Sequence, residues 1–133
     1  MSAPVTEIPE TIVLRWVEAF NERDLDRMLM HMDALVVFHP LRLSGLRGSY
    51  SGHHGVREWF AQLDRLHHHH RIVLSEARSV GDGQVFATGS LSLVGEPGIS
   101  PFCALHRLDG GLIVAAHHYL TDPDMIERLG LIP

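Results

Sequence analysis

Hydrophobic residues in the first third of the chain recur at the period of a helix. One stretch begins at Thr6 or Pro9 and ends near Asn21, with charged side chains opposite the apolar ones. Its apolar stripe consists of Val13, Trp16, Val17 and Phe20. Asp24 can cap a second, shorter helix. The stripe of that helix consists of Leu25, Met28, Leu29 and Met32. The pattern therefore predicts two consecutive amphipathic helices.

A strand and a third helix follow. Residues 34–40, ALVVFHP, are rich in β-forming residues, are apolar at both alternating positions and end at Pro40, which predicts a strand covered on both faces. We expect one of these faces to meet another subunit. After a loop rich in Gly and Ser, Ser51 and Gly52 lead into a helix. Its apolar face consists of Val56, Trp59, Phe60, Leu63 and Leu66.

From His70 onward the apolar period changes to two. The segments RIVLSEARSV, QVFATGSLSLV, ISPFCALHRL and LIVAAHHYL are separated by GDG, GEPG and DGG. They predict four strands joined by hairpins as an antiparallel meander. Asp122 and Pro123 mark a helix start and Gly130 a stop, which predicts a short C-terminal helix.

The order of these elements predicts an α+β fold. A long, bent antiparallel sheet has to cover one face with helices, and the three helices on the N-terminal side are the elements that can do so. A curled sheet wrapped on helices forms a cone with a tapered cavity at its open end. A small hydrophobic molecule is the expected ligand, and the residues that line the cavity should alternate along the strands.

Composition and charge narrow the classes of partner. A chain of 133 residues with 45% hydrophobic and 20% charged residues is expected to form one domain, residues 1–133. Its net charge of -5 and its lack of a basic cluster argue against nucleic acid as a partner.

A single cysteine, Cys103, excludes an intramolecular disulfide, and the first ten residues lack a signal-peptide pattern, so we expect a cytoplasmic protein. No apolar run approaches the roughly 20 residues of a membrane span.

Four segments resemble a known family. They are WVEAFNERDLDRMLMHMDALVVFHP, YSGHHGVREWF, LHRLDGGLIVAAHHYLTD and DMIERLGL. Together they span nearly the whole chain and are similar to the SnoaL-like branch of the nuclear transport factor 2 / ketosteroid isomerase-like superfamily. The resemblance implies a single SnoaL-like domain with a cone-shaped, cystatin-like fold. Because that superfamily includes isomerases, cyclases, hydrolases, dehydratases and non-catalytic proteins, the resemblance implies no single reaction.

Compared position by position, the resemblance disfavours two of these activities. Ketosteroid isomerases use a carboxylate base, a Tyr and a protonated Asp. The matching positions here hold His39, Trp16 and either Ala104 or Cys103, which are poor replacements for that mechanism. The strand ATGSLSLV lacks the Asp and Arg side chains with which limonene epoxide hydrolases activate water.

Two histidines match the SnoaL-type polyketide cyclases better. Those enzymes carry a His on the penultimate strand and an Asp on the last, and His106 matches the former while His118 lies at or near the latter. Strand alternation alone gives two shared faces: Ala104, His106 and Leu108 on one strand, and Ala116, His118 and Leu120 on the next. If both faces line the cavity, the two imidazoles lie close together and lower each other's pKa, which leaves at least one able to act as a base.

The remaining histidines divide between the cavity and other places. His39 could aim into the same space, so His106, His39 and His118 are the candidate acid–base residues. A packing role competes with catalysis at each of them. His117 and Tyr119 have the opposite parity and should face solvent or a dimer interface. In the run of residues 67–70 four adjacent histidines point in different directions, so we expect no metal site.

Aromatic residues are the expected walls of the cavity. The candidate ligand-binding residues are Trp16, Phe20, Tyr50, Trp59, Phe60, Phe86 and Leu120. Tyr50 precedes the third helix, where its hydroxyl either orients a ligand oxygen at the mouth or packs against a neighbouring loop.

Two functions remain open. The first is an enzyme that cyclises, isomerises or dehydrates a small, largely apolar carbonyl compound with its pocket histidines and no cofactor. The second is a non-catalytic module that binds a hydrophobic ligand or a partner in the same cavity. Both are expected to act as a homodimer, because the last strands, like the first, carry apolar residues at both parities.

Overall fold

The protein is described by a computed structural model that covers residues 8–41, 45–66, 69–95 and 97–120. The three expected helices are present. Helix α1 spans Pro9–Asn21, α2 spans Leu25–Met30 and α3 spans Gly52–Arg65. Asp24 caps α2 as expected, because its side chain accepts a hydrogen bond from the backbone N–H of Arg27 at 3.2 Å. The expected C-terminal helix, residues 122–130, lies outside the described residues.

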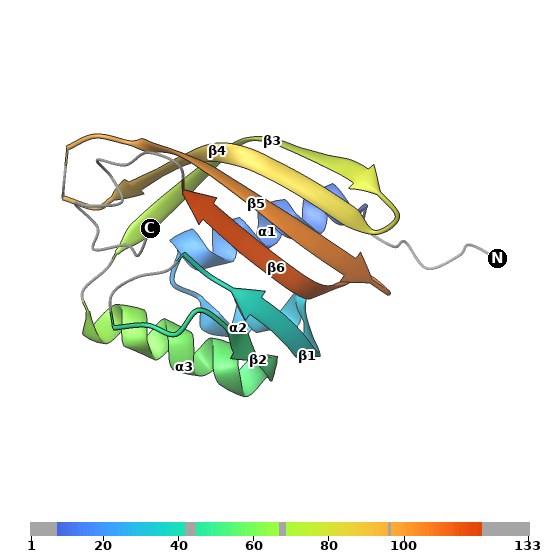
Figure 1. Cartoon of the computed structure of the whole chain (residues 1–133), viewed down its shortest axis with the longest axis horizontal. Coiled ribbons are helices and arrows are strands. Elements are labelled where there is room, and N and C mark those ends of the chain that lie inside the picture. Colours follow the sequence, from blue (N-terminus) through green and yellow to red (C-terminus); the bar gives the residue numbers. More distant parts are fainter. Residues whose placement is uncertain (1–7, 42–44, 67–68, 96, 121–133) are drawn as a thin grey trace.

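Six strands form one sheet, which is the α+β architecture predicted from the pattern (Figure 1). The strands are β1 Met32–His39, β2 Tyr50–Ser51, β3 His70–Gly81, β4 Gln84–Leu93, β5 Ser100–Asp109 and β6 Leu112–Leu120. Their order across the sheet is β2-β1-β6-β5-β4-β3. The four expected strands do form an antiparallel meander, β3 to β6.

Two features of the sheet differ from the expectation. Strand β1 pairs with β6 in parallel, whereas the whole sheet was expected to be antiparallel. The two-residue strand β2, which pairs with β1, was not predicted because two residues are too few to show a period. A parallel pair requires a long crossover connection, and α3 together with β3, β4 and β5 provides it between β1 and β6.

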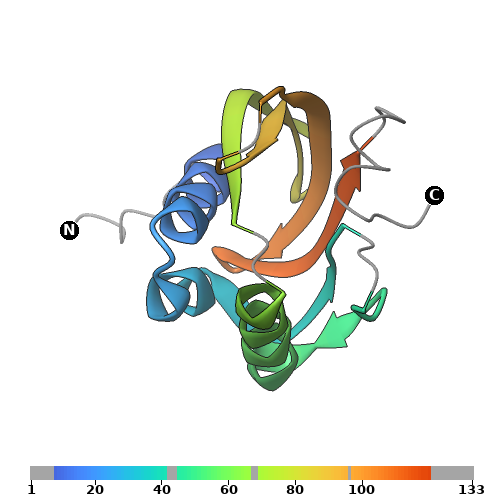
Figure 2. The same ribbon diagram turned by 90° about the vertical axis from the view of Figure 1, so that its left-hand side faces the viewer.

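The sheet curls around the helices, so that it has an inner face toward them and an outer face away from them (Figure 2). Helix α1 packs against β3 and β4, and α3 packs against β1 and β2. Asn21 ties the end of α1 to β3, since its amide donates to the Ile72 carbonyl at 2.7 Å and accepts from the Ile72 N–H at 2.9 Å. Opposite Gly89 the β3–β4 register shifts, and a Cβ at Gly89 would collide with the backbone of Val73 and Leu74. Glycine therefore permits the bend that closes the cone.

The core lies between the inner face and the helices. Alternate residues of the strands are buried there, among them Val36, Phe38, Val85, Ala87, Phe102, Ala104, Ile113 and Ala116. Trp16 and Phe20 of α1 and Trp59 of α3 fill the centre of the cone against them. Within the described residues, none of the helices is both long and apolar enough to cross a membrane.

Candidate functional site

Two histidines lie side by side on the inner face. His106 on β5 and His118 on β6 are buried, with 2% and 7% of their surface exposed. Their strands pair so that Ala104 lies opposite His118 and Ala116 opposite His106. The diagonal arrangement brings the two ring centroids to 5.9 Å. Strand alternation therefore gave the correct face for both residues.

Aromatic rings enclose His118. The centroid of its imidazole lies 5.1 Å from Phe38, 5.3 Å from Phe102 and 5.6 Å from Trp16, and each of the three ring pairs meets edge to face. These rings come from β1, β5 and α1, so three separate parts of the chain hold one imidazole. Such surroundings are apolar and offer little compensation for a positive charge.

Burial keeps both imidazoles neutral. Desolvation lowers the pKa of His106 to about 4, although a hydrogen bond to the backbone of Val85 acts in the opposite direction. Desolvation, followed by repulsion from His106 and then His117, lowers the pKa of His118 well below its ordinary value. At neutral pH each ring therefore has one N–H donor and one nitrogen acceptor.

Two polar atoms in this region have no hydrogen-bond partner within the described part of the chain. They are Nδ1 of His106 and Nε1 of Trp16, and both are buried. An unpaired polar atom in a protein interior costs about 1–3 kcal/mol, and most such atoms in native proteins are paired with protein or water. The interior of the cone therefore carries unused hydrogen-bonding capacity close to His118.

A small cavity lies beside His118. Its walls are Phe20, Pro40, Leu41, Trp59, Leu63, His70, Ile72 and His118. The volume of about 10 Å³ is that of a single water molecule. A larger ligand can enter only when wall side chains such as Phe20, Leu41 and Trp59 move aside.

The structure places some predicted wall residues in the cone and others elsewhere. Trp16, Phe20 and Trp59 are in the interior, as expected. Phe60 instead lies in a surface hollow between α2 and α3, with Arg23 5.8 Å from its ring centroid. Phe86 occupies an outward position of β4, because its neighbours Val85 and Ala87 are the fully buried ones.

His39 is also on the outer face, contrary to the expectation that it aims into the cavity. Phe38 takes the inward position of β1, and the ring of His39 stacks on His117 at a centroid distance of 4.8 Å. The stretch of β1 was apolar at both parities, so its sequence did not show which residues face inward. Residues His117 and Tyr119, expected on this outer face, are found there and stack on each other.

Tyr50 and Leu120 complete the list of predicted ligand-binding residues. Tyr50 is 1% exposed, and its hydroxyl bonds to Gln62 and accepts the N–H of Arg47 at 3.0 Å. Its hydroxyl is therefore fully occupied in holding a loop to α3, which is the packing alternative. Leu120 pairs with Phe102 through its backbone, and its side chain lies outside the described residues.

The sequence reasoning missed several residues of the site. Phe38 and Phe102 contact His118, and His70 lines the cavity. Phe102 shares the parity of Ala104 and His106, which was the available signal. For His70 a buried position at the start of β3 was hidden by the run of adjacent histidines.

Comparison with known proteins gives a family and a fold. The family described as a SnoaL-like domain matches residues 13–116. No curated protein is significantly similar to the chain in sequence.

Three solved structures illustrate the fold. A protein of unknown function from Burkholderia pseudomallei, described as NTF2-like, is 25% identical with a TM-score of 0.76, over 92% of this chain and 96% of its own. TerC, crystallised with polyporic acid, is 22% identical with a TM-score of 0.78, over 92% and 98%. A proposed polyketide cyclase from Xanthomonas campestris is 18% identical with a TM-score of 0.68, over 91% and 96%.

Proposed function

Since the chain belongs to the SnoaL-like family, we propose that it is an acid–base enzyme that isomerises, cyclises or dehydrates a small, apolar carbonyl compound inside the cone. The observation that carries this proposal is the pair of buried imidazoles, His106 and His118. Nearby, Nδ1 of His106 and Nε1 of Trp16 have no hydrogen-bond partner among the residues that the structure describes. His39 has no part in it, because it lies on the other face of the sheet.

The aromatic interior suits an apolar substrate with one polar group. Rings from Trp16, Phe38 and Phe102 provide an apolar surface around His118. The N–H of Trp16 can donate a hydrogen bond to a substrate oxygen. A carbonyl oxygen that receives such a bond becomes more electron-withdrawing, and the hydrogens on its neighbouring carbon become more acidic.

His118 is the favoured base because it lines the cavity, whereas His106 lies beside it on the next strand. A neutral imidazole can accept a proton from carbon and return it at another position, which is an isomerisation. Loss of a hydroxide or closure of a ring requires the same two proton movements. The enolate formed in this step would stabilise the imidazolium that forms with it.

A non-catalytic ligand-binding module of the same fold is the second candidate. The lowered pKa values of His106 and His118 favour it, since a base works best when its pKa is near the working pH. TerC, a protein of this fold, has been co-crystallised with polyporic acid. In this reading the unpaired nitrogens bind a ligand oxygen without moving a proton.

Deuterium exchange separates the two functions without knowledge of the product. The protein is incubated in D₂O with a panel of small aromatic and terpenoid carbonyl compounds, and NMR follows the hydrogens next to each carbonyl. An enzyme should exchange these hydrogens in at least one compound, and His118→Gln should abolish the exchange. The matched control, His117→Gln, changes the adjacent residue on the outer face and should exchange normally. Binding without exchange would select the ligand-binding module.

A cytoplasmic location is part of the proposal. Its support is that the chain has one cysteine, Cys103, and therefore no intramolecular disulfide, which suits a reducing compartment.

A further inference from the structure

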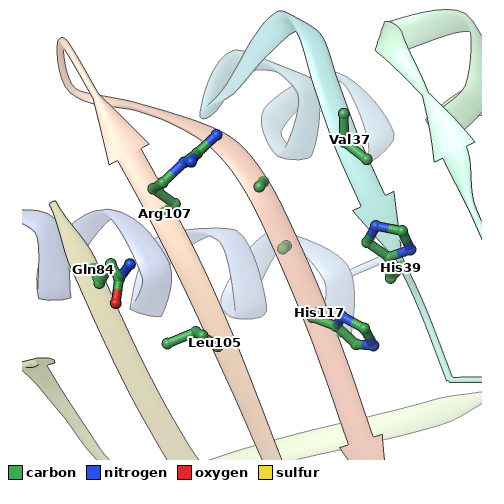
Figure 3. A pocket seen from close by; sticks show the side chains of 8 residues that line it. Val37, His39, Gln84, Leu105, Arg107 and His117 are labelled. Carbon is green, nitrogen blue, oxygen red and sulfur yellow. The ribbon is translucent and has the colours of Figure 1, made fainter.

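Hollows lie outside the cone on both layers of the fold, and they differ in what separates them from its interior. On the outer face of the sheet, a hollow of about 410 Å³ lies between Arg107 on one side and the stacked rings of His39 and His117 on the other (Figure 3). The backbone of the sheet separates that hollow from His118, because outward and inward side chains alternate along each strand. A second hollow, of about 220 Å³, lies between α2 and α3, which pack against each other. We call it the α2–α3 hollow.

The α2–α3 hollow shares a wall with the cavity beside His118. Residues that are neighbours in the chain line the two spaces, one on each side. The pairs are Trp59 and Phe60, Leu63 and Asp64, and His70 and His69. At the end of α1, Phe20 lines the cavity and Arg23 lines the hollow, and the guanidinium carbon of Arg23 lies over the Phe20 ring, 5.1 Å from its centroid. The Phe20 side chain is therefore part of the partition between the two spaces.

The backbone of Arg23 has a conformation that favours glycine. Its φ is 59°, and the residue that follows the end of a helix in this conformation is most often glycine. Two hydrogen bonds hold the turn: the N–H of Arg23 donates to the Phe20 carbonyl at 3.0 Å, and the N–H of Asp24 donates to the Ala19 carbonyl at 2.9 Å. Backbone strain of this kind is found preferentially at functional sites. An arginine at such a position therefore points to a use for its side chain.

The lining of the α2–α3 hollow combines apolar surface with positive charge. Its apolar side chains are Leu25, Phe60 and Ala61. The charged groups of the lining are two guanidinium groups, Arg23 and Arg57, and one carboxylate, Asp64. Arg23 lies over the rings of Phe20 and Phe60, at 5.1 Å and 5.8 Å from their centroids. Burial lowers the pKa of Arg23, while the charge of Asp64 acts in the opposite direction, so a second negative charge near Arg23 would be favourable.

Arg57 can turn toward a ligand at little cost. Its guanidinium lies 4.0 Å from a carboxylate oxygen of Asp26, and the Asp26 side chain is 90% exposed. An ion pair at this distance on the surface contributes little to stability. The α2–α3 hollow thus offers two arginines above an apolar floor. A guanidinium matches the two oxygens of a carboxylate with parallel hydrogen bonds.

We propose that the α2–α3 hollow is a second part of the ligand site, in which Arg23 and Arg57 bind the carboxylate of a ligand whose apolar body reaches the cone past Phe20. The substrate class is then an apolar carboxylic acid that carries its carboxylate away from the reacting carbons. This inference rests on the proposed function only in that it places the body of the ligand beside His118.

A row of rings marks the path from the hollow to His118. Arg23 lies over Phe20, Phe20 stacks on Trp16 at a centroid distance of 5.8 Å, and the rings of Trp16 and His118 are 5.6 Å apart. Rotation of the Phe20 side chain joins the two spaces, and an apolar ligand group in its place contacts Arg23 and Trp16 instead. The joined space includes the 220 Å³ of the hollow, whereas the cavity beside His118 has only about 10 Å³. A ligand larger than water therefore finds room.

NMR of the histidine ring carbons tests the proposal, with phenylbutyrate as the probe and His118→Gln as the means of assignment. Phenylbutyrate joins an apolar ring to a carboxylate, and phenylbutyramide is a neutral compound of the same shape. The acid should shift the resonances of His118 and bind at least about tenfold more tightly than the amide, the factor expected of a hydrogen bond to a charged group. The readout lies in the cone and the proposed carboxylate site in the hollow, so a single ligand has to reach both.

Three variants separate the hollow from the rest of the surface. Arg23→Gly should lower the affinity for the acid at least about tenfold and leave the affinity for the amide unchanged, and the fold should be retained because glycine adopts this backbone conformation without strain. Arg57→Gln should lower the affinity for the acid by a smaller factor, because Arg57 is half exposed. The matched control Arg78→Gln changes an exposed arginine of β3 that pairs with Glu76 and should bind both compounds as the wild type does.

Three results would overturn the proposal. They are equal affinities of the wild type for the acid and the amide, an acid that leaves the His118 resonances unshifted, and wild-type affinity for the acid in an Arg23→Gly variant with a native circular dichroism spectrum. If Arg23→Gly fails to fold, Arg23→Lys takes its place; it keeps the charge without the planar fork, so it should lose part of the preference for the acid, and an unchanged preference would contradict the proposal. Preference for the acid without deuterium exchange would support this part of the site and contradict the acid–base enzyme.

Discussion

His117 and His118 are adjacent in the chain and have opposite environments. His118 points into the cone, is 7% exposed and touches the edges of three aromatic rings. His117 points outward, is exposed and stacks between His39 and Tyr119. The alternation of a strand is the sole cause of this difference. One dipeptide thus supplies a candidate base to the interior and a solvent-exposed ring to the outer face of the sheet.

The same contrast holds for the inner and outer faces of the whole sheet. Substitutions on the two faces should differ most strongly in their effect on the free energy of unfolding. Ile72 is 3% exposed on the inner face of β3, and its neighbour Val73 is 53% exposed on the outer face. Ile72→Ala should lower the free energy of unfolding by about 2–5 kcal/mol, and Val73→Ala by less than about 1 kcal/mol. Urea denaturation at pH 7.5 measures both. Equal losses would mean that β3 does not have one buried and one exposed face.

A fall in pH should also lower the stability of the fold mainly through the inner face of the sheet. The folded pKa of His106, about 4, lies below its unfolded value of about 6.5, so stability is complete above that value and is lost as pH falls toward 4. The whole difference is worth about 3 kcal/mol. The variant His106→Gln should lose correspondingly less stability than the wild type between pH 7 and pH 4. Parallel stability curves for the two proteins, measured by urea denaturation, would contradict the burial of that ring.

Tyr50 offers a contrast between a satisfied buried hydroxyl and the unsatisfied nitrogens near His118. Its hydroxyl bonds to Gln62 and to the backbone of Arg47. Tyr50→Phe should therefore cost about 1–2 kcal/mol of unfolding free energy while ligand binding in the cone is retained. Thermal denaturation and ligand titration measure the two effects. A loss of ligand affinity without a loss of stability would mean that the hydroxyl of Tyr50 orients a ligand at the cavity mouth.

The smallest expected effect is a difference between the NMR titration curves of His117 and His118. NMR of the histidine ring carbons from pH 5 to pH 8 should show no titration of His118 and a titration of His117 with a pKa below its usual value. The assignment uses His118→Gln and His117→Gln. Similar titration curves for both rings would mean that the two faces do not differ in solvation.

The sequence predicted the elements well because their signals are local. Helical spacing located α1, α2 and α3, although Met32, expected in the apolar stripe of α2, is the first residue of β1. Period-two segments with glycine turns located β3 to β6. The face of His106 and His118 followed from the same alternation. Around His39 in β1 and Phe86 in β4, both alternating sets of residues are apolar. The pattern there does not show which set faces inward, and only packing against α1 and α3 decides which residue is buried. The small size of the cavity also depends on how Phe20, Leu41 and Trp59 meet, which involves residues far apart in the chain.

The parallel pairing of β1 with β6 has a consequence for the way the chain folds. Every other strand pair in the sheet joins neighbours in the sequence, but β1 has to wait for the whole meander before its longer edge is covered. Contacts of such long sequence separation slow folding. During synthesis on the ribosome, the segment Leu35–Phe38 emerges long before its partner and displays an apolar strand edge. A chaperone that recognises exposed apolar segments would bind this protein most readily during that interval.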